Sequence, residues 1–279
     1  MVFRSIVYWV GKTVITVSNQ KGGVGKTATV VNLAGYLVKE HQLKVMVIDL
    51  DTQGNASWSL SSYDTGLNAS EILFNNTREE NLNINNAFDE YSEKYFANDI
   101  SLVKADAVLA NIDTFDINLI VTNLAQFFKK AEEAKIDIVL VDTPPSLGKA
   151  LTGSLLVSDY VICPIELEAY SLQGVSKLQN VITNIRKYNQ NLQVLGLLPS
   201  MVDGRNRRHK KQLSLISETY PNLVISHSIG LRCSIADALS EKQFLGDVKN
   251  NNAKKAKQEF SELTNWLFNR VFEKNTINA

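Results

Sequence analysis

The segment Gln20–Thr27, QKGGVGKT, has the residue types of a loop that binds phosphate. Its glycines Gly22, Gly23 and Gly25 can adopt backbone angles closed to other residues, so successive N–H groups can turn toward one anion. An apolar strand pattern precedes the loop and an amphipathic helix pattern follows it. The segment therefore predicts a phosphate site at a helix amino terminus, where backbone donors and the helix dipole favour negative charge.

The loop departs from the strict phosphate-loop pattern at one position and adds a second cation. Gln20 stands where the pattern asks for glycine, and Lys21 accompanies the expected Lys26. In this frame Lys26 reaches the terminal phosphates and the Thr27 hydroxyl binds Mg²⁺. A glycine-rich turn that only joins a strand to a helix is the structural alternative. One cation is enough to hold a phosphate, so the pattern alone leaves the role of Lys21 open.

Three aspartates end apolar runs and are candidates for the chemistry that a bound nucleotide undergoes. Asp49 and Asp51 end one run, and their spacing predicts two carboxylates on one side of a strand. Asp142 ends another run, the place of an acid that holds magnesium directly or through a water. Asp51 is the candidate for orienting an attacking water. Such acids also form helix caps, but three of them beside a phosphate loop favour catalysis.

Strand and helix patterns alternate along the chain. The near-continuous apolar runs predict parallel strands that are covered on both faces. These runs are residues 13–18, 43–51, 136–142, 159–165 and 192–200. The amphipathic stretches between and after them predict helices over residues 29–40, 118–133, 171–188, 210–219 and 253–272. The expected fold is α/β, with a doubly wound, mostly parallel sheet.

The length of 279 residues fits one domain, expected to span residues 1–279. Residues 1–11 read as a short extension, and the polar stretch 61–99 as a surface excursion with short helices around ASEILF. The 29 basic and 29 acidic residues cancel, so any binding to nucleic acid must come from a local patch. Only two cysteines occur, which suits a reducing, cytoplasmic compartment. No stretch approaches the length of a membrane span.

Three motifs resemble those of a known family. KGGVGKT with its leading lysine, VMVIDLDTQGNAS and IVLVDTPPSLG resemble the deviant Walker A, A′ and B motifs of the ParA/MinD/Soj ATPases, closest to the ParA partition proteins. CPIELEAYSLQGVSKL, LGLLPSMVDGRNRR and SIGLRCSIADA extend the resemblance over most of the chain. The resemblance implies a P-loop fold, the cofactors ATP and Mg²⁺, and ATP hydrolysis.

The resemblance also implies a role for each lysine of the loop. Lys21 would cross a nucleotide-sandwich homodimer to the phosphates held by the other subunit, while Lys26 acts within its own subunit. The implied nucleotide contacts are Lys21, Gly22, Gly23, Val24, Gly25, Lys26, Thr27 and Ala28, with Met201 and Gly230 near the base. Ala28 replaces a threonine that is common in the family, Thr52 replaces a proline, and Gly230 also stands where proline is frequent.

Partition ATPases of this family bind nonspecific DNA as ATP-bound dimers and act with a ParB-type centromere-binding protein. Here the segment RNRRHKK supplies candidate phosphate contacts, which are Arg205, Arg207, Arg208, Lys210 and Lys211. A second basic cluster comprises Lys249, Lys254, Lys255 and Lys257. An ordinary solvated helix face is the alternative for both. The expected location is the cytoplasm, in association with the nucleoid.

The principal alternative is a MinD-like ATPase that cycles on membranes. The last amphipathic stretch places Leu263, Trp266, Leu267 and Val271 on one face, which fits either a membrane-targeting helix or a helix docked on the core. Few lysines flank that face, so docking is favoured. A metal-cluster reductase would need loop cysteines, which Cys163 in a strand pattern does not provide. The short run before the loop leaves no room for an amino-terminal helix-turn-helix domain.

Overall fold

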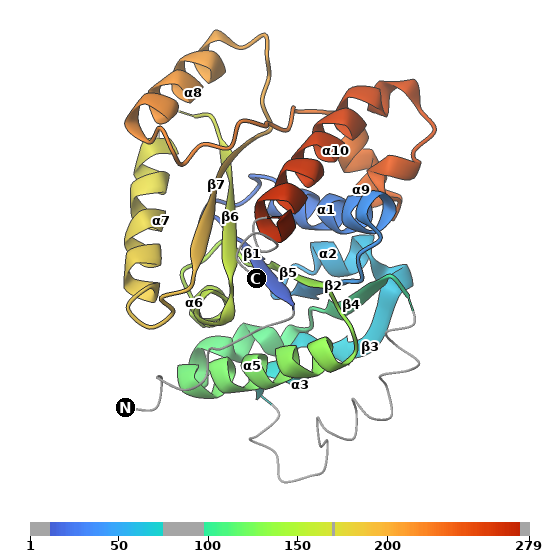
Figure 1. The fold of residues 1–279 in the computed structure, drawn as a ribbon, viewed down its shortest axis with the longest axis vertical. Coiled ribbons are helices and arrows are strands. Elements are labelled where there is room, and N and C mark those ends of the chain that lie inside the picture. Colours follow the sequence, from blue (N-terminus) through green and yellow to red (C-terminus); the bar gives the residue numbers. More distant parts are fainter. Residues whose placement is uncertain (1–11, 75–97, 169–170, 274–279) are drawn as a thin grey trace.

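The computed structural model describes residues 12–74, 98–168 and 171–273, and within them the chain forms one parallel sheet between helices (Figure 1). The strand order is β3-β4-β2-β5-β1-β6-β7, and every adjacent pair is parallel. The strands are β1 (Thr13–Val17), β2 (Val45–Asp49), β3 (Asp64–Asn68), β4 (Ile100–Lys104), β5 (Ile138–Asp142), β6 (Tyr160–Glu166) and β7 (Gln193–Ser200). The predicted α/β fold class is confirmed.

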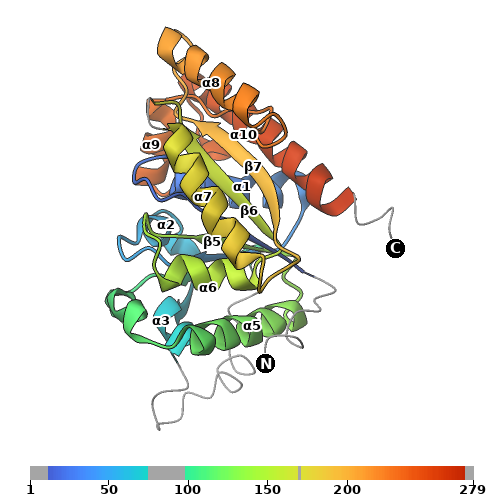
Figure 2. The same ribbon diagram turned by 90° about the vertical axis from the view of Figure 1, so that its left-hand side faces the viewer.

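Helices cover both faces of this sheet (Figures 1 and 2). On one face lie α1 (Lys26–His41), α2 (Asn55–Ser59), α9 (Cys233–Ser240) and α10 (Lys254–Phe268). On the other face lie α3 (Ala69–Phe74), α5 (Ile117–Glu133), α6 (Lys149–Val157) and α7 (Ser171–Ile185), with α8 (Arg207–Thr219) packed beyond α7. Short 3₁₀ turns span Ser61–Tyr63, Ala107–Thr114, Leu245–Asp247 and Asn251–Ala253, and a π-helical turn, Asn269–Glu273, follows α10.

The central strands are buried on both faces because their side chains alternate between two helical layers. Ile15 packs on the side of α1 and α10, whereas its neighbour Val14 packs on the side of α3 and α5. Val47 and Ile48 divide in the same way. This double burial explains the uninterrupted apolar runs in the sequence.

The short helix expected around ASEILF is present as α3, but residues 61–74 are not the surface excursion that the sequence suggests. Residues Asp64–Asn68 form edge strand β3, which pairs with β4, and the helix α3 that follows packs its apolar side chains into the core. Strand β3 has an exposed, polar sequence because it lies at the sheet edge, where one long side meets no other strand. Residues 75–97, like the extension 1–11, lie outside the described residues.

The last helix is docked on the core. Leu263, Leu267 and Val271 are fully buried, and α10 packs along α1 (Figure 1). Trp266 is partly buried against the same cluster. The apolar face that could have served a membrane is therefore covered by the protein itself. In the described part of the chain, no helix combines the length and apolar character needed to cross a bilayer.

Candidate nucleotide-binding site

The glycine-rich loop connects the carboxyl end of β1 to α1, as the sequence predicts. Gly23 and Gly25 have φ angles of 74° and 86°, in the left-handed region that glycine adopts freely. A Cβ atom placed on Gly25 would lie 2.7 Å from the Ser200 hydroxyl. Both the φ angle and this close approach therefore disfavour a larger residue at position 25. No side chain caps the first turn of α1 and no acid lies in it. Its backbone donors are thus available to an anion.

Lys26 lies buried beneath this loop. Its ammonium donates a hydrogen bond of 3.1 Å to the backbone carbonyl of Lys21, which folds the side chain back along the loop. Burial lowers the pKa of Lys26, while the charges of Asp142 and Asp51 oppose that shift. A polyanion beside this ammonium would restore its preference for the charged state. The position suits the contact with phosphate that the sequence predicts.

Thr27 and Asp142 meet as a pair at the same edge. The Thr27 hydroxyl donates a hydrogen bond of 2.7 Å to Asp142 Oδ2, although the two residues are 115 positions apart. The other oxygen, Asp142 Oδ1, is buried and has no hydrogen-bond partner among the described residues. Burial and the neighbouring charge of Asp49 raise the pKa of Asp142 to about 8. An unpartnered carboxylate oxygen beside a hydroxyl is a donor set that fits Mg²⁺.

Asp49 and Asp51 do not form the parallel pair that their spacing predicts. Strand β2 ends at Asp49, so Asp51 lies in the turn beyond it rather than on the strand. Asp49 Oδ1 accepts a hydrogen bond of 3.1 Å from the backbone N–H of Asp51. Asp51 in turn accepts one of 3.0 Å from Gln53 N–H through its own Oδ1. The two carboxylates therefore differ in position: Asp49 is fully buried and supports the turn as a brace, by accepting from the Asp51 N–H, whereas Asp51 lies nearer the surface.

Burial also changes the pKa of the Asp49 carboxylate. Loss of solvent raises the pKa of Asp49 to about 6, against the lowering effect of hydrogen bonds from Ser57. Asp49 and Asp142 are register partners on adjacent strands, so their negative charges add. A cation at this edge would relieve that repulsion, which agrees with a magnesium site beside Asp142.

Lys21 lies on the opposite side of the loop from Lys26. Its ammonium donates hydrogen bonds of 2.7 Å to Glu166 and 2.5 Å to Glu168, and these raise the pKa of Lys21. Glu166 ends β6, whereas Asp142 ends β5, and β1 lies between these two strands. The Lys21 side chain is 49% exposed. The two lysines of one loop therefore face different surroundings, one internal and one open to solvent.

The predicted base contacts lie on two adjacent segments. Met201, with a φ of 55°, follows β7, and its neighbour Val202 forms an isolated parallel bridge with Gly230. The N–H of Gly230 is already used, because it donates a hydrogen bond of 2.9 Å to Glu259. Glu259 also binds the Arg232 guanidinium through two hydrogen bonds. Gly230 thus does not offer its N–H to a base, and proline at this position would remove the bond to Glu259.

The other predicted contacts separate into backbone and surface positions. Val24 is a buried residue of the loop, and Ala28 packs against the core on the first turn of α1. The basic residues of RNRRHKK are exposed around the amino terminus of α8, and these are Arg205, Arg207, Arg208, Lys210 and Lys211. They follow β7, so they lie at the same carboxyl edge of the sheet as the phosphate loop. In the second cluster Lys257 is tied to Gly246 O, whereas Lys249, Lys254 and Lys255 are exposed.

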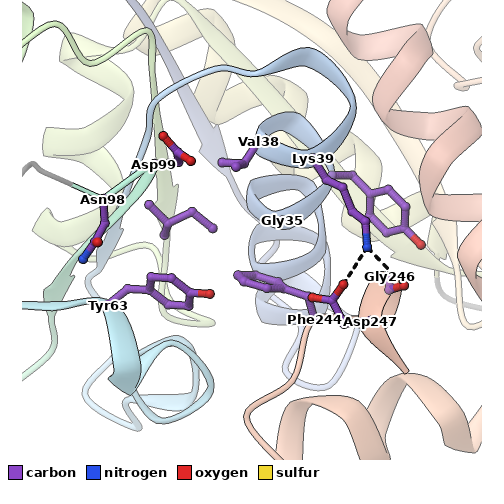
Figure 3. Close-up of a pocket in the computed structure, with 11 residues that line it drawn as sticks. Gly35, Val38, Lys39, Tyr63, Asn98, Asp99, Phe244, Gly246 and Asp247 are labelled. Carbon is purple, nitrogen blue, oxygen red and sulfur yellow. Dashed lines mark hydrogen bonds and ion pairs between the residues drawn. The ribbon is translucent and has the colours of Figure 1, made fainter. Parts of the chain in front are cut away.

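A separate pocket of about 400 Å³ lies at the amino-terminal edge of the sheet (Figure 3). Tyr63 and Phe244 form its aromatic wall, with ring centroids 5.5 Å apart. Lys39 forms an ion pair with Asp247 across its rim. None of the predicted site residues lines this pocket. In parallel sheets of this kind, ligands bind beyond the carboxyl ends of the strands, whereas this pocket lies at their amino ends. The phosphate loop, not this pocket, is therefore the candidate site.

Comparisons with known proteins identify a matching family and named relatives of this chain. A family model described as AAA domain matches residues 12–194. Protein IncC of Escherichia coli is 40% identical over 267 residues, which cover 93% of this chain and 70% of IncC. The chromosome-partitioning ATPase Soj of Thermus thermophilus is 33% identical over 193 residues, covering 68% of this chain and 70% of Soj.

Solved structures show the same fold. A plasmid partition protein from Borrelia burgdorferi, bound to AMPPNP, superposes with a TM-score of 0.68 at 24% identity, over 92% of this chain and 99% of that protein. The sequence relatives go further than the fold, because the chain covers more than two thirds of each. The domain model, the deviant phosphate loop and these relatives together show that the chain belongs to the ParA-type family of partition ATPases.

Proposed function

We propose that the protein is an ATP-dependent molecular switch in plasmid or chromosome partition. ATP and Mg²⁺ join two copies into a sandwich dimer, the dimer holds nonspecific DNA, and a ParB-type partner stimulates hydrolysis and release. The observation that carries the proposal is the different burial of the two lysines of the loop. Lys26 is buried against the phosphate loop, whereas Lys21 is partly exposed beside it.

The nucleotide site supports the binding of ATP with magnesium. The backbone of Gly22–Gly25 and the first turn of α1 supply N–H donors to phosphate oxygens, and Lys26 adds a charge. Thr27 and Asp142 would hold Mg²⁺, Asp142 directly or through a water. The metal supplies charge neutralisation on the terminal phosphates. AMPPNP bound to the Borrelia relative supports a nucleotide of this kind.

The exposure of Lys21 supports the proposed dimerisation. In the single chain its charge is neutralised by Glu166 and Glu168, but exposed ion pairs contribute only about 0–1 kcal/mol each. A triphosphate presented by a second copy carries several negative charges and competes well with that pairing. ATP in one subunit would therefore attract Lys21 of the other, and two such contacts close the dimer.

Hydrolysis requires a group that orients water at the terminal phosphate. Asp51 lies in the turn just after β2, close enough to Lys26 for its charge to affect the pKa of that lysine. We assign the water-orienting role to Asp51, the charge-stabilising role to Lys26 and Lys21, and the metal to Thr27 and Asp142.

DNA binding is assigned to the basic amino terminus of α8. The five basic side chains there are exposed, and the positive end of the helix dipole adds to their attraction for phosphate. A dimer would present this patch twice, so a weak contact in one chain becomes a useful one. The protein would thereby associate with the nucleoid in the cytoplasm, with no membrane involved.

Charge reversal at Arg207 and Arg208 is expected to weaken DNA binding at least about tenfold and to reduce its salt dependence, because each lost phosphate contact lowers the logarithmic salt slope by about 0.9. ATPase activity should persist, since among the described residues neither arginine forms a hydrogen bond or ion pair with the phosphate loop. The measurement is retention of nonspecific duplex DNA with ATP, ADP and no nucleotide across a salt series. The matched control reverses Lys129 and Lys135, exposed lysines of α5 and its end. DNA retention equal to that of the control would remove α8 from the interface.

A further inference from the structure

We propose that Ser57 is a positioning residue for ATP hydrolysis, acting through Asp49 on the turn that carries Asp51. The inference rests on the proposed function, because it assigns a further residue to the same reaction. Ser57 lies on α2, eight positions beyond Asp49, and the hydrogen bonds that it donates go to Asp49 rather than to the phosphate loop. Nothing in the phosphate-loop pattern points to it.

Ser57 holds one oxygen of Asp49 by two hydrogen bonds. Its backbone N–H lies 2.8 Å from Asp49 Oδ2, and its hydroxyl lies 2.7 Å from the same oxygen. Asp49 is fully buried, so it depends on these donors in place of water. Hydrogen bonds to a charged group are stronger than those between neutral groups. Ser57 is thus a main support of this buried carboxylate.

The direction of the hydroxyl bond is fixed by a third contact. The backbone N–H of Ala105, just after β4, donates a hydrogen bond of 2.8 Å to Ser57 Oγ. The oxygen accepts from Ala105, and its own proton points to Asp49. Ser57 therefore links the ends of β2 and β4 through one hydroxyl group. Alanine at this position would lose both bonds at once.

The other oxygen of Asp49 carries the effect to the reaction site. Asp49 Oδ1 accepts from Asp51 N–H, and Asp51 O accepts a bond of 2.8 Å from Gly54 N–H. The turn between β2 and α2 is thereby tied at Asp49 at its start and through Ser57 at its end. Rotation of the Asp49 carboxylate would move the backbone of Asp51. A displacement of about 1 Å at a reacting group can cost about 100-fold in rate.

The neighbours of Asp49 show which part of the site a movement of its carboxylate would disturb. Asp142, the register partner of Asp49, holds Thr27, so the brace borders the predicted magnesium site. Among the described residues, the phosphate loop forms no hydrogen bond with Ser57 or Asp49. Loss of the Ser57 hydroxyl should therefore affect turnover more than nucleotide binding.

The test compares Ser57→Ala with Ser57→Thr and with Ser59→Ala in the full-length protein. Ser57→Ala is expected to lower kcat about tenfold, the effect of about 1.4 kcal/mol, with the KM for ATP changed less than about twofold. Ser57→Thr retains the hydroxyl and should recover most of the rate. Ser59 is the control, because it is a buried serine of the same helix whose hydroxyl binds Leu239 O instead.

Steady-state ATPase kinetics and thermal melting decide the outcome. A Ser57→Ala rate equal to that of wild type, or a loss matched by Ser59→Ala at equal melting temperature, overturns the positioning role. A loss in Ser57→Ala that Ser57→Thr does not relieve overturns it as well, since the hydroxyl is then not the active feature. Absence of turnover in the wild-type protein would instead remove the proposed function and this inference together.

Discussion

Replacing Lys21 with alanine is expected to abolish ATP-dependent dimerisation while leaving nucleotide binding by the single chain. The Lys21 side chain contacts Glu166 and Glu168, whereas Lys26 binds the Lys21 backbone carbonyl, which alanine retains, so the substitution leaves the phosphate loop intact. In the dimer its loss would leave buried phosphate charge unpaired, which costs about 3–5 kcal/mol and weakens association at least about 100-fold. Sedimentation with a non-hydrolysable ATP analogue and Mg²⁺ measures this, with fluorescent nucleotide binding alongside.

A second variant shows whether release of Lys21 limits closure. Glu168→Gln removes one of the two carboxylates that hold the ammonium, so Lys21 is freed at the cost of one exposed ion pair. Dimers should then form at lower nucleotide concentration than in wild type. A Lys21→Ala protein that still dimerises and hydrolyses ATP at the wild-type rate would show that this lysine has no role across the interface.

Replacing Asp51 with alanine is expected to stall hydrolysis and preserve the ATP-bound dimer. A group that orients the attacking water, or accepts a proton from it, accelerates the reaction about 100-fold to 10,000-fold. The kcat of the variant should therefore fall by at least about 100-fold. Binding should persist, because the hydrogen bond of Lys26 to the Lys21 carbonyl and that of Thr27 to Asp142 do not involve the Asp51 carboxylate. Single-turnover hydrolysis and sedimentation on the same preparation check both halves of this prediction.

Asp237→Asn is the matched control for Asp51→Ala, because Asp237 is an exposed acid of α9 whose side chain lies outside the candidate site. It should hydrolyse ATP as wild type does. Hydrolysis by Asp51→Ala at more than a tenth of the wild-type rate would transfer the water-orienting role to another group. Loss of nucleotide binding in Asp51→Ala would instead make this residue part of the binding site.

The fold was predictable where strands are buried on both faces. Residues 136–142 and 159–165 carry uninterrupted apolar runs, and the structure places β5 and β6 there. The edge strand β3 was missed because only one of its five residues, Thr65, is buried, so no apolar pattern marks it. The end of β2 was placed two residues late, because apolar Leu50 continues the strand pattern beyond Asp49.

The site was predictable where a motif fixes the chemistry and not where the fold assembles it. The loop, Thr27 and Asp142 follow from residue types and strand ends, and the hydrogen bond between these two residues brings them together. The partners of Lys21 lie 145 and 147 positions away, so no local pattern reveals them. A glutamate at the end of an apolar run, as Glu166 is, was the available signal.

The base side of the site illustrates how context replaces a missing residue. Gly230 stands where the family frequently has proline, and the resemblance implies only that it lies near the base. In the fold its N–H binds Glu259, and a Cβ atom at this position would lie 2.7 Å from the Arg232 guanidinium. Glu259 therefore links Gly230 and Arg232 into one hydrogen-bonded unit, and the sequence alone does not reveal this unit because Glu259 is distant from the other two along the chain.

The most direct measurement is the mass of the wild-type protein by light scattering, with magnesium and either AMPPNP, ADP or no nucleotide. Two phosphate sites that each need a lysine from the other copy predict the mass of two chains with AMPPNP and of one chain, 31.1 kDa, in the other two conditions. A single-chain mass with saturating AMPPNP would contradict the shared site. So would equal masses in all three conditions, because nucleotide would then not control assembly.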